Sequence, residues 1–358
     1  MLECPDGLQF GIDNQFWETG PQFKGLKAIP PGAHYVYFAL KDENYENRMG
    51  FFIHVREASQ PDTQDVVVKK WSPENQLFES LGEQETLAFS ESVRNMDFDR
   101  NLGAYPMDNL SQWQGLSGFI SREVVDRLDS LNHYTLSEGK ERELRDKEDV
   151  PAEEEGDIEK TMEAIEKQVR EEEAKQEKAA KRLYKYREAF TGGSYYTDIP
   201  AKKVLHGLTG SALTEANFDK TSILRDVLSK VGSPAALLAE LQYAFVSFVV
   251  GENLESFEHW KRLVHLLCTC SAGLHASDPL SAELFMKFVP VMYEQLRQLP
   301  KDFFSDDLSK VSFLKDSLNA FSSNVEDERV SPALKARAGK LRKMLQEEYG
   351  FYPAESID

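Results

Sequence analysis

The spacing of apolar residues divides the chain into a first part with strand-like patterning and a last part with helical patterning. Near the N-terminus, three segments rich in aromatic and β-branched residues are separated by turn formers: AHYVYFAL (33–40), RMGFFIHVRE (48–57) and DVVVKKW (65–71). This pattern predicts strands that are joined as an antiparallel meander. From Glu83 the spacing becomes helical, and short helices are expected at 108–114 and 121–131, the latter with Ser121 as its N-cap.

The C-terminal part predicts only helices. Ser233 and Ser331 each precede a proline, an arrangement that is typical of a helix start. Gly251 is expected to end the first of these helices, and Pro290 is expected to kink a helix predicted over 279–299. Short connections between the helices favour antiparallel packing of neighbours.

Between these parts, residues 138–182 have a composition that cannot form a packed core. Of these 45 residues 28 are charged, 17 of them acidic and 11 basic. A narrow apolar stripe runs from Ile158 to Val169, and Glu–Lys pairs four residues apart favour a long charged helix. A solvated spacer is the preferred interpretation, and a short coiled-coil contact is the alternative.

The complete pattern predicts an α+β protein with a β-rich, mostly antiparallel N-terminal domain followed by an all-helical domain. We expect the β-rich domain over 1–135, a charged and helical linker over 136–194, the helical domain over 195–350 and a short tail over 351–358.

One segment of the helical part is a candidate for either a catalytic site or a buried helix face. In FEHWKRLVHLLC (257–268), Phe257, Trp260 and Leu263 lie on one helix face, which predicts that Trp260 belongs to the core. Lys261 and Arg262 lie on other faces. His259 has no acidic partner at motif spacing, so a catalytic role is not favoured.

Composition narrows the function further. The formal net charge is −19, which opposes affinity-setting contact with nucleic acid. Three cysteines without a CxxC motif indicate reduced thiols rather than disulfides or a metal site. The chain shows no signal peptide and no apolar run long enough to span a bilayer, so a soluble protein of the cytoplasm and nucleus is expected.

Motifs for catalysis were sought and not found. The sequence contains no phosphate-binding GxxxxGK[ST] loop, no GxSxG elbow and no HExxH motif. We therefore expect no catalytic residues, no cofactor and no metal. The residues by themselves favour a scaffold or adaptor protein over an enzyme.

Several segments together resemble one family. In chain order they are FGID (10–13), WETGPQFKGLKAIPPG (17–32), RMGFF (48–52), GAYP (103–106), ELQYAFVSFVVG (240–251), FEHWKRLVHLLC (257–268) and LPKDFF (299–304). In order and spacing the chain resembles the cistron-splicing factor (AAR-two) family of U5 snRNP assembly factors. Against that family, the chain before FGID and after the last helix is expected to be short.

The resemblance implies a non-enzymatic splicing factor whose helical domain is VHS-like. It implies binding to the large U5 scaffold protein, Prp-eight, at its RNase H-like and Jab/MPN-like domains. It also implies that the U5 helicase, Brr-two, and RNA are kept from binding too early, and that the factor leaves before the mature particle forms.

Two other hypotheses remain open at this point. A VHS-like adaptor that binds peptides in trafficking is the alternative, and a hydrolase that uses His259 or His265 is a third hypothesis. The candidate residues for a partner interface are Lys261, Arg262, Lys340, Lys343, Phe351 and Tyr352. No direct high-affinity nucleic-acid contact and no membrane contact are expected.

Overall fold

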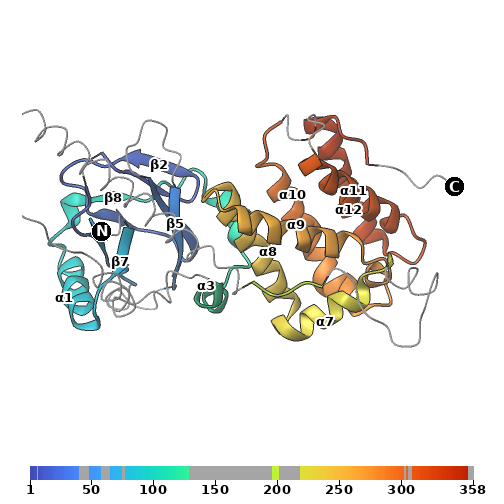
Figure 1. Ribbon diagram of the computed structural model, residues 1–358, viewed down its shortest axis with the longest axis horizontal. Coiled ribbons are helices and arrows are strands. Elements are labelled where there is room, and N and C mark those ends of the chain that lie inside the picture. Colours follow the sequence, from blue (N-terminus) through green and yellow to red (C-terminus); the bar gives the residue numbers. More distant parts are fainter. Residues whose placement is uncertain are drawn as a thin grey trace, which may run out of the picture.

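The protein was analysed as a computed structural model, which describes residues 1–5, 7–39, 48–57, 65–74, 77–128, 196–200, 218–301, 304 and 309–353. Strands occupy the N-terminal part and helices the C-terminal part of the molecule (Figure 1). This arrangement confirms the α+β fold class with a helical second half. The charged 138–182 segment lies outside the described residues.

A four-stranded antiparallel sheet forms the centre of the N-terminal part. Its strands are ordered β2 (Gln15–Glu18), β1 (Gln9–Ile12), β4 (Gly32–Ala39) and β5 (Arg48–Val55). Two smaller pairs flank it: β3 (Gly25–Lys27) is parallel to β8 (Leu102–Ala104), and β6 (Lys69–Ser72) is antiparallel to β7 (Leu77–Ser80). The strands predicted at 33–40 and 48–57 are confirmed.

The strand predicted over 65–71 is wrong in its first half, because regular pairing begins only at Lys69. The Asp65 carboxylate accepts the backbone N–H of Arg56 at 2.8 Å and is also bonded by the Arg56 guanidinium. A side chain therefore holds this part of the segment, where the sequence pattern had predicted a backbone ladder.

The helices that follow agree closely with the predicted ones. Three belong to the N-terminal part: α1 (Glu83–Arg94), α2 (Leu110–Ser117) and α3 (Arg122–Leu128). The C-terminal part contains α7 (Thr221–Val231), α8 (Pro234–Val249), α9 (Leu254–Cys268), a π-helical turn (Ser281–Phe285) that leads into α10 (Met286–Leu296), α11 (Ser309–Val325) and α12 (Pro332–Tyr349).

The caps predicted at Ser233 and Ser331 are present. The Ser233 hydroxyl accepts the N–H of Ala236 at 3.1 Å, and the Ser331 hydroxyl accepts that of Leu334 at 3.3 Å. Each cap satisfies one of the backbone donors that a helix start leaves without an intrahelical acceptor. The proline that follows each serine has no N–H to satisfy.

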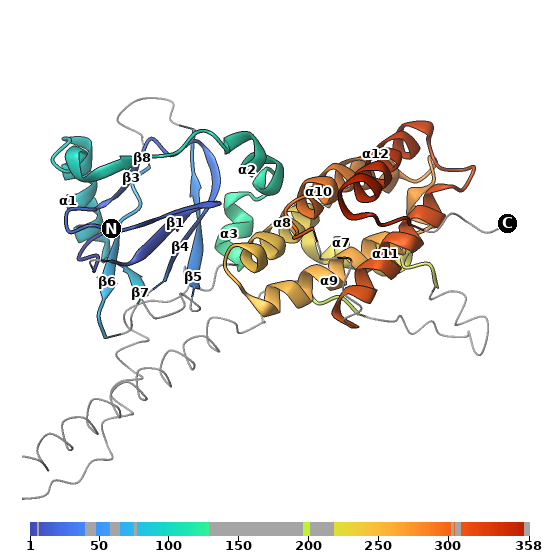
Figure 2. The same cartoon turned by 90° about the horizontal axis from the view of Figure 1, so that it is seen from above.

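The two faces of the main sheet contribute to different cores. Phe10, Val36 and Phe38 belong to a core within the N-terminal part, together with Trp71 and Phe78. Tyr35, Tyr37 and Phe52 belong instead to the large core of the C-terminal helices. Figure 2 shows α2 and α3 between the strands and the helices α8 and α10. One hydrophobic core therefore spans both parts of the chain.

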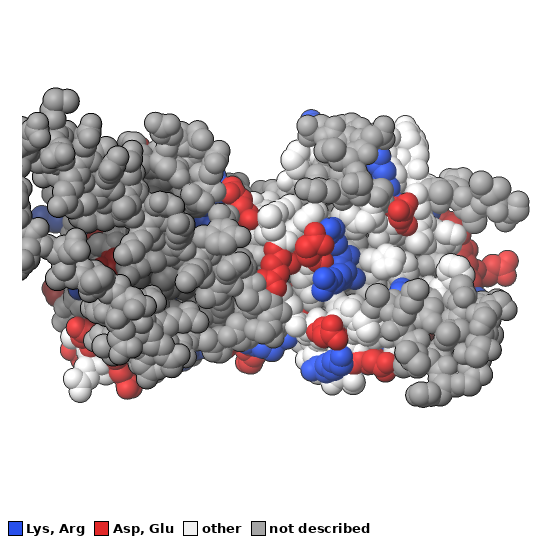
Figure 3. All heavy atoms as spheres, viewed as in Figure 1, with Lys and Arg blue, Asp and Glu red and all other residues white. Residues whose placement is uncertain are grey.

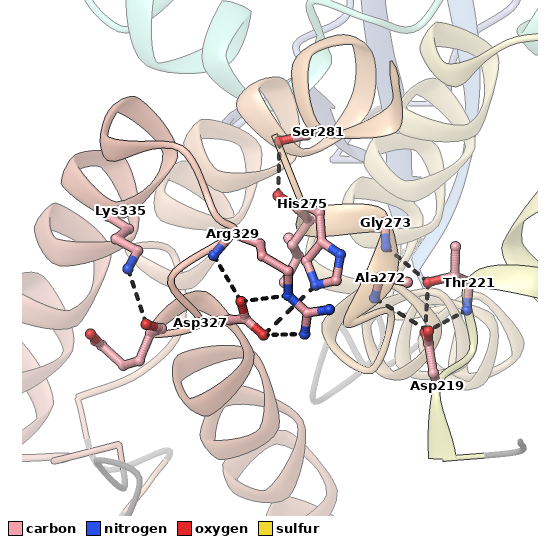
Figure 4. Close-up of polar contacts among 11 residues, drawn as sticks. Asp219, Thr221, Ala272, Gly273, His275, Ser281, Asp327, Arg329 and Lys335 are labelled. Carbon is pink, nitrogen blue, oxygen red and sulfur yellow. Dashed lines mark hydrogen bonds and ion pairs between the residues drawn. The ribbon is translucent and has the colours of Figure 1, made fainter. Parts of the chain in front are cut away.

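Loops at the far end of the helical part are fixed by buried and surface polar contacts (Figure 4). Asp219 accepts the Thr221 hydroxyl at 2.6 Å and the Ala272 N–H at 3.2 Å. Asp327 pairs with Arg329 at 2.6 Å and lies 3.8 Å from His275. These contacts join the start of α7 to the chain after α9, and the α11–α12 turn to the same region.

Two further observations concern the described part of the chain as a whole. No helix in it combines the length and the apolar character that crossing a bilayer requires. Cys268 and Cys270 are buried thiols, and burial raises the pKa of both.

Candidate functional site

The two parts of the protein meet at Tyr35, whose ring lies against two glycines. A Cβ atom built on Gly50 would fall 2.5 Å from this ring, and one built on Gly251 would fall 2.1 Å from the Tyr35 hydroxyl. Close approach of the N-terminal sheet therefore requires glycine at 251. Helix α8 ends at Val249 with Val250 as its C-cap, so the predicted end of the helix at Gly251 is confirmed, but the positive φ of this turn, 55°, belongs to Glu252 and not to Gly251.

We expect Gly251→Ala to lower the free energy of unfolding by about 2 kcal/mol, since the new methyl group meets Tyr35 and the Ser247 carbonyl oxygen in a packed interior. The matched control is Gly339→Ala on α12, where a Cβ atom would meet nothing within 4 Å. That change should be neutral or stabilising because alanine favours helix. Denaturant unfolding of both variants measures the difference, and equal stabilities would contradict the close approach.

Helix α2 is bonded to both parts of the protein. The Trp113 indole N–H donates to the Ala33 carbonyl oxygen of β4 at 2.8 Å. From the other side, the buried Gln242 amide of α8 accepts the Phe119 N–H at 2.8 Å and donates to the Gly115 carbonyl at 2.9 Å. Gln242 thus caps the end of α2, where backbone groups lack helical partners. Helix α2 therefore connects the sheet to the helical part through hydrogen bonds on both of its sides.

A buried carboxylate forms the second junction. Glu240 of α8 is fully buried, and its oxygens lie 2.7 Å from Arg127 Nη2 of α3 and 2.7 Å from His259 Nε2 of α9. They also accept the backbone N–H of Thr197 at 2.7 Å and its hydroxyl at 2.9 Å. Tyr196 stacks on the His259 ring at 4.2 Å. The cluster thereby joins four separate stretches of the chain.

The surroundings of Glu240 fix its charge. Burial by itself would raise its pKa, but the side chains of His259 and Arg127 and the N–H of Thr197 outweigh that effect and lower the pKa to about 2. Glu240 is therefore ionised at neutral pH, and Arg127 supplies a compensating charge. A buried and fully partnered carboxylate of this kind serves structure, because no solvent-accessible proton acceptor is left on it.

His259 has an acidic partner that the sequence pattern could not show. The acidic partner is Glu240, nineteen positions upstream on the preceding helix, a distance that no short motif covers. The His259 side chain is 5% exposed, so it has no access to a substrate in solution. The other histidine that was considered, His265, has its Nδ1 3.4 Å from the Ser317 hydroxyl, but Ser317 is itself buried.

A third buried cluster holds the start of the chain against the sheet. Asp13 accepts the backbone N–H of Tyr35 at 2.9 Å, the Tyr105 hydroxyl at 2.6 Å and His34 Nδ1 at 2.8 Å. Burial and the hydrogen bond to Asp13 raise the pKa of Tyr105. Asp13 and Tyr105 belong to FGID and GAYP, two segments that the family resemblance had singled out.

The predicted interface residues on α9 are only partly available. Lys261 lies 2.6 Å from Glu258 and over the rings of Phe257 and Phe313 at 4.9 and 5.4 Å, and its side chain is 21% exposed. Arg262 is exposed. Figure 3 shows basic and acidic side chains next to one another over the helical part on the face that it draws.

Two of the predicted residues come together on α12. Lys340 and Lys343 are exposed and line a hollow of about 640 Å³ between α10 and α12. At the end of this helix, Phe351 stacks on Phe304 at 5.2 Å, whereas Tyr352 is 72% exposed. The structure therefore offers Lys340, Lys343 and Tyr352 for contact, and it places Phe351 partly in the core.

The described residues contain no group of three or more histidine, cysteine, aspartate or glutamate side chains placed to hold a metal ion. The polar clusters at Asp13 and Glu240 are buried contacts between segments of the chain. The two parts share one hydrophobic core, and α9 and α12 carry exposed charged residues.

Comparison with known proteins identifies the family. The model of the AAR2 N-terminal domain matches residues 1–130, and that of the AAR2 C-terminal repeat region matches residues 196–353. This chain belongs to the AAR2 family. The Protein AAR2 homolog of Caenorhabditis elegans is 30% identical over 351 residues, covering 98% of this chain and 92% of the relative.

Two further relatives also match most of this chain. The Protein AAR2 homolog of Homo sapiens is 29% identical over 369 residues, covering 100% of this chain and 90% of the relative. The A1 cistron-splicing factor AAR2 of Saccharomyces cerevisiae is 19% identical over 309 residues, covering 85% of this chain and 77% of the relative. The AAR2 family thus includes a splicing factor.

Three segments that first indicated the AAR2 family meet at the junctions described above. Gly50 of RMGFF and Gly251 of ELQYAFVSFVVG both lie against Tyr35, and His259 of FEHWKRL pairs with Glu240. Gly251 and the Arg127–Glu240 pair join the two parts of the chain, whereas Gly50 packs against Tyr35 within the sheet and His259 pairs with Glu240 within the helical part.

Proposed function

We propose that this AAR2 protein is a pre-mRNA splicing factor that acts without catalysis, as an assembly chaperone of the U5 snRNP. In this proposal it binds the large scaffold protein Prp-eight through the RNase H-like and Jab/MPN-like domains of that partner. While bound, it blocks premature binding of the helicase Brr-two and of RNA. It acts in the cytoplasm and nucleus and leaves before the tri-snRNP forms.

The observation that carries this proposal is the match of both parts of the chain to one family that includes a splicing factor. The structure adds a second reason to treat the chain as one unit. Phe52 of the sheet stacks on Tyr243 of α8 at 4.4 Å, and Arg48 of β5 lies 3.5 Å from Glu252. A free-standing VHS-like adaptor needs no such shared core, so the splicing role is favoured over the trafficking role.

Charge supports a protein partner over an RNA partner. The net charge of −19 repels phosphate and attracts the basic surfaces that RNA-binding proteins carry. A protein of this charge that covers such a surface would exclude RNA in two ways, by occupying the surface and by repelling the approaching strand. We therefore propose no direct high-affinity contact with nucleic acid or membrane.

We expect the purified chain to bind the two C-terminal domains of the scaffold and to bind them more weakly as salt rises. Long-range attraction between charges is screened beyond a Debye length of about 8 Å at physiological ionic strength, so the dissociation constant should rise by about tenfold between low and high salt. Titration calorimetry at several salt concentrations measures this. A purified chain that binds neither domain at any salt concentration would refute the proposed partner.

The proposed function also predicts that this protein and RNA compete for the scaffold. U5 RNA should compete with this protein for the scaffold, and the protein alone should not retard U5 RNA in an electrophoretic shift assay. A ternary complex of RNA, scaffold domain and this protein, formed without competition, would contradict the exclusion of RNA.

A further inference from the structure

Two adjoining hollows cross the surface of α10 and link it to both of its neighbours. One, of about 640 Å³, lies between α10 and α12, and the other, of about 480 Å³, lies between α10 and α2. Both are lined by Pro290, Glu294 and Arg337. We call the two hollows together the α10 groove. The groove includes residues from both parts of the chain, since α2 belongs to the N-terminal part.

The centre of the α10 groove holds an arginine in a fixed position. Pro290 has no backbone N–H, so the carbonyl oxygen of Met286, four residues earlier, lacks its helical donor. Arg337 of α12 fills that place, with Nη1 2.9 Å from the Met286 oxygen. One hydrogen bond engages a single N–H of the five that a guanidinium carries, and Arg337 is exposed. The remaining donors are available to an acceptor in the groove.

Positive charge is in excess along this groove. Lys287, Arg337 and Lys340 form no ion pair with any described residue, and all three are exposed. The glutamates nearby are already engaged: Glu294 and Glu348 face Arg297 at 4.0 and 3.6 Å, and Glu347 faces Lys343 at 3.6 Å. In a chain of net charge −19 this is a local reversal of sign.

The walls of the hollow between α10 and α12 are partly apolar. Val289, Pro290, Tyr293 and Met344 line it beside the charged residues. Tyrosine, methionine and arginine are enriched where proteins bind one another, and a fixed guanidinium matches a carboxylate through two parallel hydrogen bonds. An RNA backbone offers no apolar group for these walls.

We propose that the α10 groove binds an extended acidic segment of the protein partner, with a carboxylate on Arg337 and an apolar neighbour over Tyr293 and Met344. Pro290, Glu294 and Arg337 line both hollows, so an extended segment can occupy the two together. Lys287 and Lys340 then flank the segment on the two sides. This inference rests on the proposed function for the identity of the partner, but its chemistry is independent of that identity.

The test compares two single lysine reversals in the full chain. Lys340→Glu changes the groove, and Lys230→Glu changes an exposed lysine of α7 that does not line it. Both alter the net charge by the same amount, so a general charge effect is cancelled. We expect Lys340→Glu to weaken binding of the scaffold domains by about tenfold and Lys230→Glu by less than about twofold.

A second probe separates this inference from the proposed function. The probe is a fluorescent ten-residue peptide that alternates glutamate with leucine and phenylalanine, and its control has lysine in place of glutamate. We expect the acidic peptide to bind the wild-type chain at least about tenfold more tightly than the basic one, and Lys340→Glu to remove most of that preference. Arg337→Lys, which keeps the charge but loses the planar fork, should also weaken the acidic peptide.

The outcomes are distinguishable. In one outcome, the acidic peptide binds and loses its binding in Lys340→Glu while the scaffold domains do not bind at all. That result would support the α10 groove as a binding site for acidic segments and would refute the proposed partner. If the scaffold domains bind both lysine variants alike and the acidic peptide shows no preference over the basic one, the groove inference is overturned. Displacement of the acidic peptide by single-stranded RNA at equal concentration would also overturn it, in favour of a phosphate-binding surface.

Discussion

Trp260→Ala is expected to lower the free energy of unfolding by about 3–5 kcal/mol, the range found when a large aromatic side chain is removed from a core. Trp260 is fully buried on α9, and its ring lies 5.4 Å from that of Phe245 and 6.3 Å from that of Phe313. Its indole N–H donates to the Gln295 side chain of α10 at 2.9 Å. Alanine therefore leaves both a cavity and a buried amide without its donor.

Two tryptophan variants serve as controls. Trp260→Phe keeps most of the volume and loses the hydrogen bond to Gln295, so it should cost about 1–2 kcal/mol. Trp17→Ala removes a tryptophan that is 36% exposed on β2 and should change stability by less than about 1 kcal/mol. Urea unfolding measures all three. A Trp260→Ala protein that unfolds like the wild type but fails to bind its partner would show that Trp260 is an interface residue and not a core residue.

Glu240→Gln is expected to lower the free energy of unfolding by about 3 kcal/mol, because it leaves Arg127 and His259 without the carboxylate that they share. We take the lower end of the cost of breaking a buried ion pair, since the Arg127 side chain is 38% exposed and keeps part of its hydration. The matched control is Glu283→Gln, which alters an exposed glutamate of the π-helical turn and should be close to neutral.

The contribution of Glu240 should also depend on pH. Its pKa is about 2 in the folded protein and 4.5 for an ordinary glutamate, so the unfolded chain binds a proton first as pH falls. A depressed pKa stabilises the folded state above about pH 4.5, and this stabilisation is lost as pH falls toward about 2. Groups facing Glu240 include Arg127, His259 and Tyr196.

The measurement is the difference in unfolding free energy between the wild type and Glu240→Gln from about pH 6 to about pH 3. We expect this difference to shrink as the pH falls, because the wild type loses the ionised carboxylate that the variant never had. Other carboxylates titrate equally in both proteins and cancel. If this difference stays constant across the pH range, the charge of Glu240 does not contribute to the free energy of unfolding.

Much of the fold follows from local pattern. The Ser-Pro pairs at 233 and 331 determine where α8 and α12 begin, because a capping hydroxyl and a fixed φ act within a single helical turn. The three-and-four spacing of Phe257, Trp260 and Leu263 identifies the buried face of α9. These features can be predicted from the sequence, since each depends on residues only a few positions apart.

For the predicted interface residues, too, the sequence shows some features and only the tertiary structure shows the others. Lys340 and Lys343 are recognisable in the sequence as exposed residues of a basic helix. That they stand beside a groove depends on α10 and on Pro290, some fifty residues away, because the carbonyl that Pro290 leaves open is what positions Arg337. Lys261 looked equally available, but Phe313 of another helix covers it.

The sequence by itself therefore determined the order of a strand-rich part and a helical part, the starts of α8 and α12, the buried face of α9, and the family. Only the tertiary structure decided how the two parts join: Tyr35 against Gly251, Glu240 between Arg127 and His259, and Gln242 on the end of α2. The physical reason is separation along the chain. Local rules act over one turn or one strand pair, whereas these contacts bring together residues that are up to 216 positions apart, and that distance is closed only when the whole core forms.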